Sequence, residues 1–322
     1  MKIGISFPSF ARDEFLVPPD RLTGFARTAE TNGYSGLWMP EHLVQPPTYK
    51  TSFMDPLASV AQMLGATERL QVGTGILILP LRNPVLLAQR AATVQYLSAE
   101  RLTLGVGLGY NEPEFEAAGI PYDERSSRFT EGIELLWRLL HEESVTFDGR
   151  HYQVEDLTIE PRPNRPPRIL LAGSGTENDN GERFVPRSIK ERLLYADGWL
   201  APGQTIAEQK HDWDAFAEFL SDHDRDPSAY DTLAVTYTHL VPNADSELAT
   251  ERQLSVYRQH TTWPEDHYER NYLLGSIEDV REGLQEYERI GFDQVVALTS
   301  AHDLDDIDRQ LDLWPRHYPE YF

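Results

Sequence analysis

The chain contains no cysteine, which excludes disulfide bonds and any chemistry that depends on a thiolate. It also lacks any run of about 18 apolar residues, so the sequence predicts no membrane-spanning helix. The first residues, MKIGIS, enter a predicted strand directly and do not form the basic and then apolar segment of an export signal. These absences together predict a cytoplasmic protein.

Lysine and positive charge are scarce. The chain has four lysines among 29 basic residues, against 52 acidic residues, and a formal net charge of −23. A field this negative repels nucleic-acid phosphates and anionic membranes, so neither is a predicted partner. At molar salt the Debye length shrinks to about 3 Å, and crowded surface carboxylates then scarcely repel one another. We interpret the composition as adaptation to a high-salt cytoplasm, as in a halophilic archaeon; an ordinary acidic enzyme is the alternative.

What the chain does have is a regular alternation of apolar runs and amphipathic segments. The predicted strands cover residues 2–7, 36–39, 71–78, 102–107, 168–172, 198–200, 232–240 and 294–298. The predicted helices lie near residues 20–32, 55–66, 84–97, 124–141, 187–195, 205–220, 246–259, 277–290 and 303–313. This alternation predicts an α/β fold, a (β/α)8 TIM barrel that forms one domain over residues 1–322, with loop insertions at its C-terminal face. A doubly wound sheet is the alternative, but GVGLGY at 105–110 supplies only part of its glycine motif.

Local signals mark the ends of several elements. Asp20 is placed to cap the first helix, and Ser276 with Asp279 has the spacing of a capping box. Gly291 follows the predicted end of that later helix. Residues 146–154 predict a hairpin with Asp148-Gly149 in its turn.

Residues 72–110 carry the clearest indication of a ligand site. They read as two apolar strands joined by a helix, which predicts a parallel pair. Glycines at the strand ends indicate backbone that lies close to a ligand. Because TIM-barrel active sites lie at the C-terminal ends of the strands, the residues that follow each strand are the candidates.

Several blocks of the chain resemble the luciferase-like monooxygenases, the family that includes bacterial luciferase and the deazaflavin-dependent oxidoreductases. The blocks are MKIGISFPSF at the start, GYSGLWMPEH at 33–42, the 72–110 run, DERSSRFTEGIELLW at 123–137, ADGWLAPG at 196–203 and GSIEDVREGLQEYERIGFDQVVAL at 275–298. Their order and spacing together carry the resemblance, which also implies the barrel.

Glu41 and His42 form the strongest polar pair at a predicted strand end. The resemblance implies that His42 lies at the reactive face of a flavin, as a proton donor or as a stabiliser of charge during hydride transfer. It implies that Glu41 orients His42 or contacts the ring. A histidine held by a structural hydrogen bond is the alternative. No metal site is predicted, because no ligand spacing such as H-E-x-x-H occurs.

The resemblance implies cofactor contacts at the third and fourth strand ends, from Thr74, Gly75 and Ile76 and from Leu108 and Tyr110. It predicts a non-prolyl cis bond between Gly75 and Ile76 behind the ring; an ordinary β-bulge is the alternative. Tyr110 stands where the sugar-phosphate dehydrogenases of the deazaflavin group carry an acidic residue. A sugar phosphate is therefore not the predicted substrate.

A cofactor phosphate is expected at the loop after the fifth strand. Gly173, Ser174 and Gly175 offer backbone N–H groups and a hydroxyl there. Ser188 is a further candidate near the start of the next helix. The resemblance implies that Arg128 reaches the phosphate from the helix after the fourth strand; a surface arginine is the alternative.

Two segments depart from the usual pattern of the family. Residues 175–186 are longer than the expected loop and predict a flexible surface insertion or a lid. Residues 255–274 are rich in aromatic side chains and predict either a mobile lid over the barrel mouth or a wall of a subunit interface.

The favoured function is an oxidoreductase that uses a deazaflavin, coenzyme F-420, for hydride transfer to or from an unidentified small organic substrate. VGTGILILPLRNP resembles these members more than the light-emitting ones. One alternative is an FMN-dependent monooxygenase that uses O2 and a partner flavin reductase; another is a non-catalytic flavin-binding barrel. The resemblance also implies a homodimer that uses the helices near the second and third strands.

Overall fold

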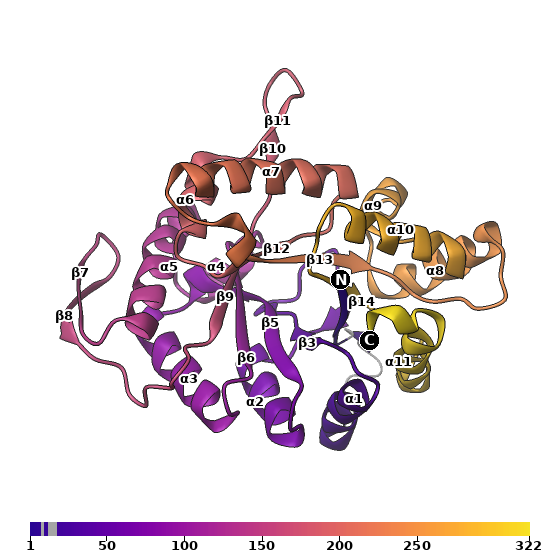
Figure 1. Ribbon diagram of the computed structural model, residues 1–322, viewed down its shortest axis with the longest axis horizontal. Coiled ribbons are helices and arrows are strands. Elements are labelled where there is room, and N and C mark those ends of the chain that lie inside the picture. Colours follow the sequence, from indigo (N-terminus) through magenta and orange to yellow (C-terminus); the bar gives the residue numbers. More distant parts are fainter. Residues whose placement is uncertain (8–9, 12–17) are drawn as a thin grey trace.

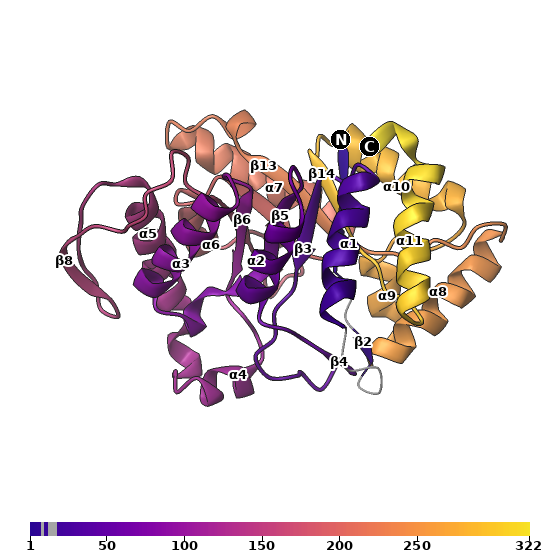
Figure 2. The ribbon, with the colours of Figure 1, turned by 90° about the horizontal axis from the view of Figure 1, so that it is seen from below.

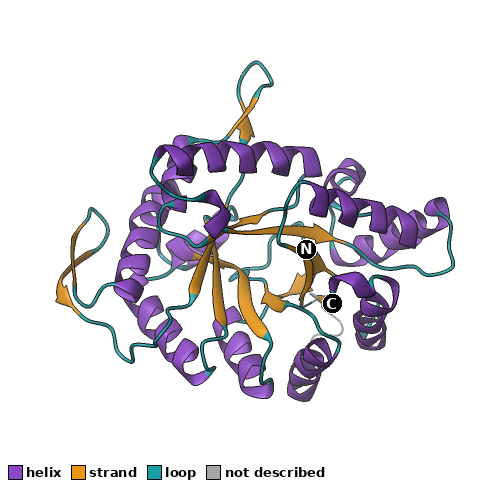
Figure 3. Cartoon of the chain, in the orientation of Figure 1, coloured by secondary structure: helices purple, strands orange, loops and turns teal. Residues whose placement is uncertain are grey.

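Parallel strands close into a barrel at the centre of the protein (Figures 1 and 3). The structure is a computed structural model and describes residues 1–7, 10–11 and 18–322. The barrel strands are β1 (Lys2–Ser6), β3 (Gly36–Met39), β5 (Gln71–Ile78), β6 (Leu102–Gly107), β9 (Arg168–Ala172), β12 (Gly198–Ala201), β13 (Asp231–Tyr237) and β14 (Gln294–Leu298). Their order around the barrel is β1-β14-β13-β12-β9-β6-β5-β3. The predicted (β/α)8 barrel is confirmed, and closure excludes the open doubly wound sheet.

Helices surround the strands on the outside of the barrel (Figure 3). Those that the alternation predicts are α1 (Pro19–Thr31), α2 (Pro56–Ala66), α3 (Pro84–Leu97), α5 (Arg125–His141), α6 (Arg187–Leu193), α7 (Ile206–Asp222), α8 (Ser246–His260), α10 (Ile277–Arg289) and α11 (Leu304–His317). Two further helices, α4 (Glu112–Ala117) and α9 (Glu265–Asn271), were not predicted from the sequence, because neither is long enough to show a clear helical period. Within the described ranges, no helix combines the length and apolarity that crossing a membrane requires.

The barrel interior has its own small core, because alternate strand residues point inward. Trp38 is its largest member, and it packs with Leu170, Leu200, Leu233 and Val296. Glycine at position 73 makes room for this indole, since a Cβ there would lie 2.8 Å from the Trp38 ring. The larger core fills the space between the strands and the surrounding helices.

The caps are partly as predicted. Ser276 and Asp279 form the full capping box of α10, and Gly291 follows that helix with φ of 91°. The prediction for Asp20 was wrong: Pro18 is the N-cap of α1, and no side chain caps this end. Because α1 begins at Pro19, Asp20 lies inside the first turn, beyond the capping position.

Several short elements lie outside the barrel. The predicted hairpin forms from β7 (Val145–Asp148) and β8 (Gln153–Leu157), but its predicted turn was partly wrong: Asp148 still belongs to β7 and pairs with Gln153, so the connection covers residues 149–152. The 175–186 insertion forms a second hairpin, β10 (Thr176–Glu177) and β11 (Arg183–Phe184), which projects beyond α7 in Figure 1. A third pair joins β2 (Phe10–Ala11) to β4 (Thr51–Ser52). Short 3-10 turns cover Leu79–Leu81, Tyr122–Glu124, Pro227–Ala229 and Pro319–Tyr321.

The predicted strand over 232–240 was too long at its end. β13 stops at Tyr237, although Thr238 and Leu240 continue an apolar pattern. The reason is tertiary: the Leu240 N–H donates to the side-chain oxygen of Gln310 on α11 at 2.8 Å, so the chain leaves the sheet.

Candidate active site

A cavity of about 400 Å³ opens at the C-terminal ends of the barrel strands. Figure 2 shows both chain termini at one end of the barrel and α4, β2 and β4 at the other. Its lining comes from the ends of most strands: Phe7, Pro40, Glu41, His42, Gly75, Ile76, Gly107, Leu108, Tyr110, Gly173, Pro202, Tyr237 and Thr299 are among its residues. TIM-barrel active sites occupy this end, and ligand cavities usually measure about 300–1,000 Å³.

His42 is held in place by a carboxylate that the sequence analysis did not identify. Its Nδ1 lies 3.3 Å from each carboxylate oxygen of Glu114. The His42 side chain is 11% exposed, and that of Glu114 is fully buried. An ionised carboxylate can only accept, so Nδ1 carries the proton of the neutral ring and Nε2 is left for a ligand. This arrangement suits a residue that exchanges a proton with a substrate.

Glu114 also stabilises the loop that carries His42. Its Oε1 accepts the backbone N–H of Leu43 at 2.6 Å and that of Val44 at 3.4 Å. These donors make the burial of a carboxylate tolerable, because each replaces a hydrogen bond to water. Glu112, two residues after Tyr110 in the chain, is exposed. The available signal was the Asn-Glu-Pro start of α4, a pattern typical of a helix N-terminus.

Glu41 lines the same cavity and is 9% exposed, but both of its oxygens are engaged. Arg82 donates to Oε2 at 2.8 Å and forms a second, shorter contact with Oε1. Oε2 also accepts the Ile78 N–H at 2.7 Å. Glu41 thus joins the end of β3 to the end of β5. A catalytic role for it stays a prediction; the contacts indicate that it shapes the cavity wall.

The peptide bond between Gly75 and Ile76 is cis, as predicted. The pairing of β5 with β6 shifts register between Thr74 and Leu77, so the strand is irregular at this point. Gly75 and Ile76 line the cavity. Thr74 is fully buried, and its hydroxyl donates to the Gly105 carbonyl at 2.8 Å, so it braces the bulge from behind.

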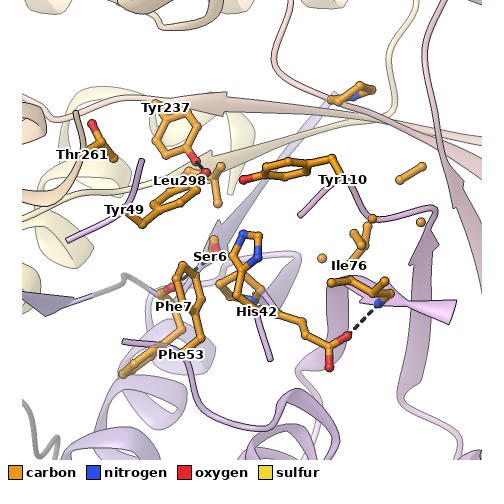
Figure 4. A pocket seen from close by; sticks show the side chains of 18 of the residues that line it. Ser6, Phe7, His42, Tyr49, Phe53, Ile76, Tyr110, Tyr237, Thr261 and Leu298 are labelled. Atoms are coloured by element: carbon orange, nitrogen blue, oxygen red, sulfur yellow. Dashed lines mark hydrogen bonds between the residues drawn. The ribbon is translucent and has the colours of Figure 1, made fainter. Parts of the chain in front are cut away.

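Aromatic side chains surround His42, as Figure 4 shows. The ring centroids of Phe53, Tyr49 and Tyr110 lie 4.7, 5.3 and 5.7 Å from the centroid of its imidazole. The hydroxyls of Tyr49 and Tyr237 lie 3.3 Å apart. Burial raises the pKa of both phenols well above the usual value, so both stay neutral. Leu108, also predicted, lines the cavity beside Tyr110.

Only some of the residues predicted to bind the cofactor phosphate lie at the cavity. Gly173 lines the cavity, and Ser174 follows it in the same loop. The Gly175 N–H is already donated to Asp212 at 2.7 Å. Ser188 is exposed in the first turn of α6. Arg128 forms an ion pair with Glu124 at 2.7 Å, so a phosphate there would compete with a carboxylate.

The two variable segments are both tied to the fold. At the base of the 175–186 hairpin, Arg183 forms two hydrogen bonds with Asp212, of 2.8 and 2.6 Å. Asp212 is fully buried. Tyr257, Tyr268 and Tyr272 of the 255–274 segment pack together in a buried cluster. His260 and Thr261 of the same segment line the cavity, so this segment is a wall of the site.

One buried hydroxyl points to a ligand in the cavity. Thr299 follows β14, is 3% exposed and lines the cavity, and its Oγ1 finds no hydrogen-bond partner among the described residues. A buried hydroxyl without a partner is costly, and a polar ligand atom would relieve that cost. Among the described residues, no group of three His, Asp or Glu side chains could hold a metal ion.

Known proteins resemble the chain over most of its length. Residues 1–294 match the family model described as luciferase-like monooxygenase. The chain is 28% identical over 305 residues to the F-420-dependent glucose-6-phosphate dehydrogenase of Intrasporangium calvum. This alignment covers 88% of this chain and 90% of that protein. It is 30% identical over 212 residues to the F-420-dependent hydroxymycolic acid dehydrogenase of Mycobacterium tuberculosis, covering 65% of this chain and 56% of that protein.

Solved structures show the same fold. A monooxygenase of Streptomyces bottropensis superposes with a TM-score of 0.83 at 22% identity, and both chains are covered completely. An F-420-dependent secondary alcohol dehydrogenase in complex with an F-420–acetone adduct superposes with a TM-score of 0.81 at 17% identity, again over the whole of both chains.

Proposed function

We propose that this chain, which belongs to the luciferase-like monooxygenase family, is an oxidoreductase that depends on the deazaflavin coenzyme F-420. The observation that carries the proposal is the His42–Glu114 pair, placed in an apolar cavity at the C-terminal strand ends. The curated relatives, whose names specify F-420-dependent dehydrogenases, support this cofactor.

The cavity fits a flat, mostly apolar ring system. Ile76, Gly107, Leu108 and Ala172 supply an apolar surface at its floor. A Cβ at position 107 would lie 2.8 Å from the Ile76 side chain, so a larger residue there would have to displace Ile76. Gly173 with Ser174, and Ser188 with Arg128, are the candidates to hold the cofactor phosphate. When bound, a deazaflavin supplies a centre that accepts or releases a hydride.

The chain's own residues would manage the proton. His42 Nε2 takes a proton from the substrate, or returns it in the opposite direction. Glu114 fixes the tautomer of His42 and stabilises the imidazolium that forms. The rings of Phe53, Tyr49 and Tyr110 exclude water, which strengthens electrostatic interactions inside the cavity.

The alternative is an FMN-dependent monooxygenase that uses O2 and receives reduced flavin from a partner reductase. The structural likeness to the Streptomyces monooxygenase supports this alternative only at the level of the fold. A non-catalytic barrel would have no use for a histidine whose ring is fixed by a fully buried carboxylate.

An anaerobic titration with F-420 and with FMN, each followed by absorbance, tests the proposal. We expect F-420 to bind at least about tenfold more tightly, a difference of about 1.4 kcal/mol. Gly107→Ala should weaken binding, because the new methyl group pushes Ile76 into the cavity. Gly65→Ala is the matched control, since a Cβ there meets no atom within 4 Å. Tighter binding of FMN would favour the monooxygenase, and binding of neither cofactor would refute the proposed function together with both flavin-binding alternatives.

We further propose a homodimer and adaptation to high salt. Leu86, Tyr96 and Leu97 of α3 are 57, 63 and 77% exposed, an unusual set of large apolar side chains on one surface helix. This supports the predicted use of the helix near the third strand. The net charge of −23 supports the second proposal, for which thermal stability should rise with added potassium chloride.

A further inference from the structure

The cavity that contains His42 has very little charge. Among its described lining residues there is no lysine or arginine, although the chain has 29 such residues. Its one carboxylate, Glu41, is neutralised by the ion pair with Arg82 behind the wall. The remaining basic side chains of the lining are the imidazoles of His42 and His260.

Most polar groups of the lining already have partners within the protein. The Tyr49 and Tyr237 hydroxyls contact each other, and the Thr261 hydroxyl lies 2.8 Å from that of Tyr268. His260 Nε2 lies 2.6 Å from the Ala301 carbonyl oxygen. His42 Nε2 and the Thr299 hydroxyl are two polar groups that can face a ligand, beside the hydroxyls of Ser300 and Tyr110 in the same lining.

An anionic substrate is a poor match for these walls. A phosphate monoester carries about −1.5 to −2 charges at pH 7 and normally binds to arginine, lysine or several N–H groups. Moving such a group into an apolar cavity without a cation is costly. The net charge of −23 adds a long-range field that repels anions.

We infer that the substrate is an uncharged, largely apolar molecule with one hydroxyl or carbonyl group, of the secondary alcohol or ketone class. The inference rests on the proposed function. The rings of Phe53, Tyr49 and Tyr110 lie around His42 (Figure 4). The hydrocarbon part of the substrate would pack against these rings, with its single oxygen near His42. The substrate thus differs from glucose 6-phosphate, the sugar phosphate in the name of the Intrasporangium relative.

The reaction balances with the groups named. In the oxidative direction the C–H bond of the carbinol carbon would break, and a bound oxidised deazaflavin would supply the acceptor for its hydride and two electrons. The O–H bond breaks, its proton goes to His42 Nε2, and a C=O double bond forms. The alcohol is oxidised by two electrons, and the cofactor is reduced by the same two.

The test compares two alcohols that differ only in charge, cyclohexanol and 4-hydroxycyclohexanecarboxylate, together with glucose 6-phosphate. Reduction of F-420 by the holoenzyme is followed by absorbance at molar potassium chloride, where long-range repulsion is screened. We expect kcat/KM for cyclohexanol to exceed the values for both anions by about 100-fold or more. Comparable values for either anion would overturn the inference.

A variant tests the physical cause. Tyr110→Arg places a cation at the cavity mouth, so kcat/KM for the carboxylate should rise at least about tenfold while that for cyclohexanol does not. Leu248→Arg is the matched control, because Leu248 is exposed on α8 and does not line the cavity. An equal gain in both variants would mean that overall charge, and not the cavity, sets the selectivity, which contradicts the inference.

The outcomes separate this inference from the proposed function. If F-420 fails to bind in the titration described above, the proposed function fails. If F-420 binds but neither alcohol is oxidised, binding of the same compounds is measured from their effect on the spectrum of the bound cofactor. Selective binding of cyclohexanol then supports an uncharged substrate, whereas binding of the anions, or of no compound, overturns it.

Discussion

The imidazole of His42 and the carboxylate of Glu114 lie 3.3 Å apart, although 72 positions separate the two residues in the chain. His42 lies in the loop that follows β3, and Glu114 lies on α4, which follows β6. The pair shows the geometry of a proton-transfer group and its orienting partner. Glu114 is not among the described residues that line the cavity, so we regard it as a residue that positions His42.

The first prediction follows from that pair. Glu114→Gln keeps an oxygen that can accept from Nδ1 but removes the negative charge. The imidazolium is then less stable, so kcat should fall about 10- to 100-fold with KM nearly unchanged. Glu112→Gln, in the same helix but exposed, is the control and should behave as the parent. Equal effects of both changes, or a change in KM alone, would argue against a positioning role.

The second prediction concerns His42 itself. His42→Ala should lower kcat by about 100-fold or more, because the substrate proton loses its acceptor, while the cofactor Kd changes little. His223→Ala, on the exposed end of α7, serves as the control. Stopped-flow measurement of hydride transfer and a cofactor titration give the two quantities. Full activity would remove His42 from the mechanism, and loss of folding would show a structural role instead.

The third prediction concerns the hairpin insertion. Arg183→Met removes the cation that faces the buried Asp212, so the free energy of unfolding should fall by about 3–5 kcal/mol. Arg187→Met breaks an ion pair whose side chains are 83 and 45% exposed and should cost about 1 kcal/mol at most. Urea denaturation of both variants measures the difference. Similar small losses would show that the hairpin base contributes little to stability.

The fourth prediction is a pH dependence that arises at His239. Burial lowers its pKa below the usual 6.5, although Asp306 at 4.0 Å acts in the opposite direction. The Ser300 carbonyl, His302 and Arg309 also face this imidazole. Above pH 6.5 the ring is neutral in both the folded and the unfolded state. As the pH falls through 6.5, the unfolded chain takes up a proton that the folded protein resists, so stability declines.

His239→Gln should flatten this decline between about pH 7.5 and 5.5, as measured by urea denaturation at each pH. His223→Gln is the control, because His223 is exposed and its removal should leave the slope unchanged. A slope that is the same in the parent and in His239→Gln would assign the acid sensitivity to other groups.

The fifth prediction concerns assembly. Leu97→Glu puts a charge in the exposed apolar set of α3, so a dimer formed through this helix should dissociate. Light scattering in molar potassium chloride at micromolar concentration should then report the monomer mass for the variant and twice that mass for the parent. Leu248→Glu, on α8, is the control. A parent protein that is already monomeric would refute the proposed interface.

The local pattern of the sequence determined the barrel. The apolar strands and the amphipathic helices alternate along the chain. A buried parallel strand is recognisable from its own apolar run, without knowledge of distant residues. The capping box of α10 was also readable, because Ser276 and Asp279 are three positions apart and act on the same helix turn. The cis bond at Gly75–Ile76 could be predicted only through the family resemblance, since no propensity marks it.

The tertiary structure decided which side chains meet. The role of Glu114 could not be predicted from the sequence, because its partner His42 is 72 residues away and its helix has only six residues. Arg128 is a different case, because Glu124 precedes it by only four positions: the spacing of this ion pair is local and was present in the sequence. β13 ends before the predicted position, because the Leu240 N–H donates a hydrogen bond to Gln310 on a helix that is distant in sequence. For Glu114 and for the end of β13, a long-range hydrogen bond competes with a local preference of comparable size, and the order of residues in the chain does not indicate which of the two forms.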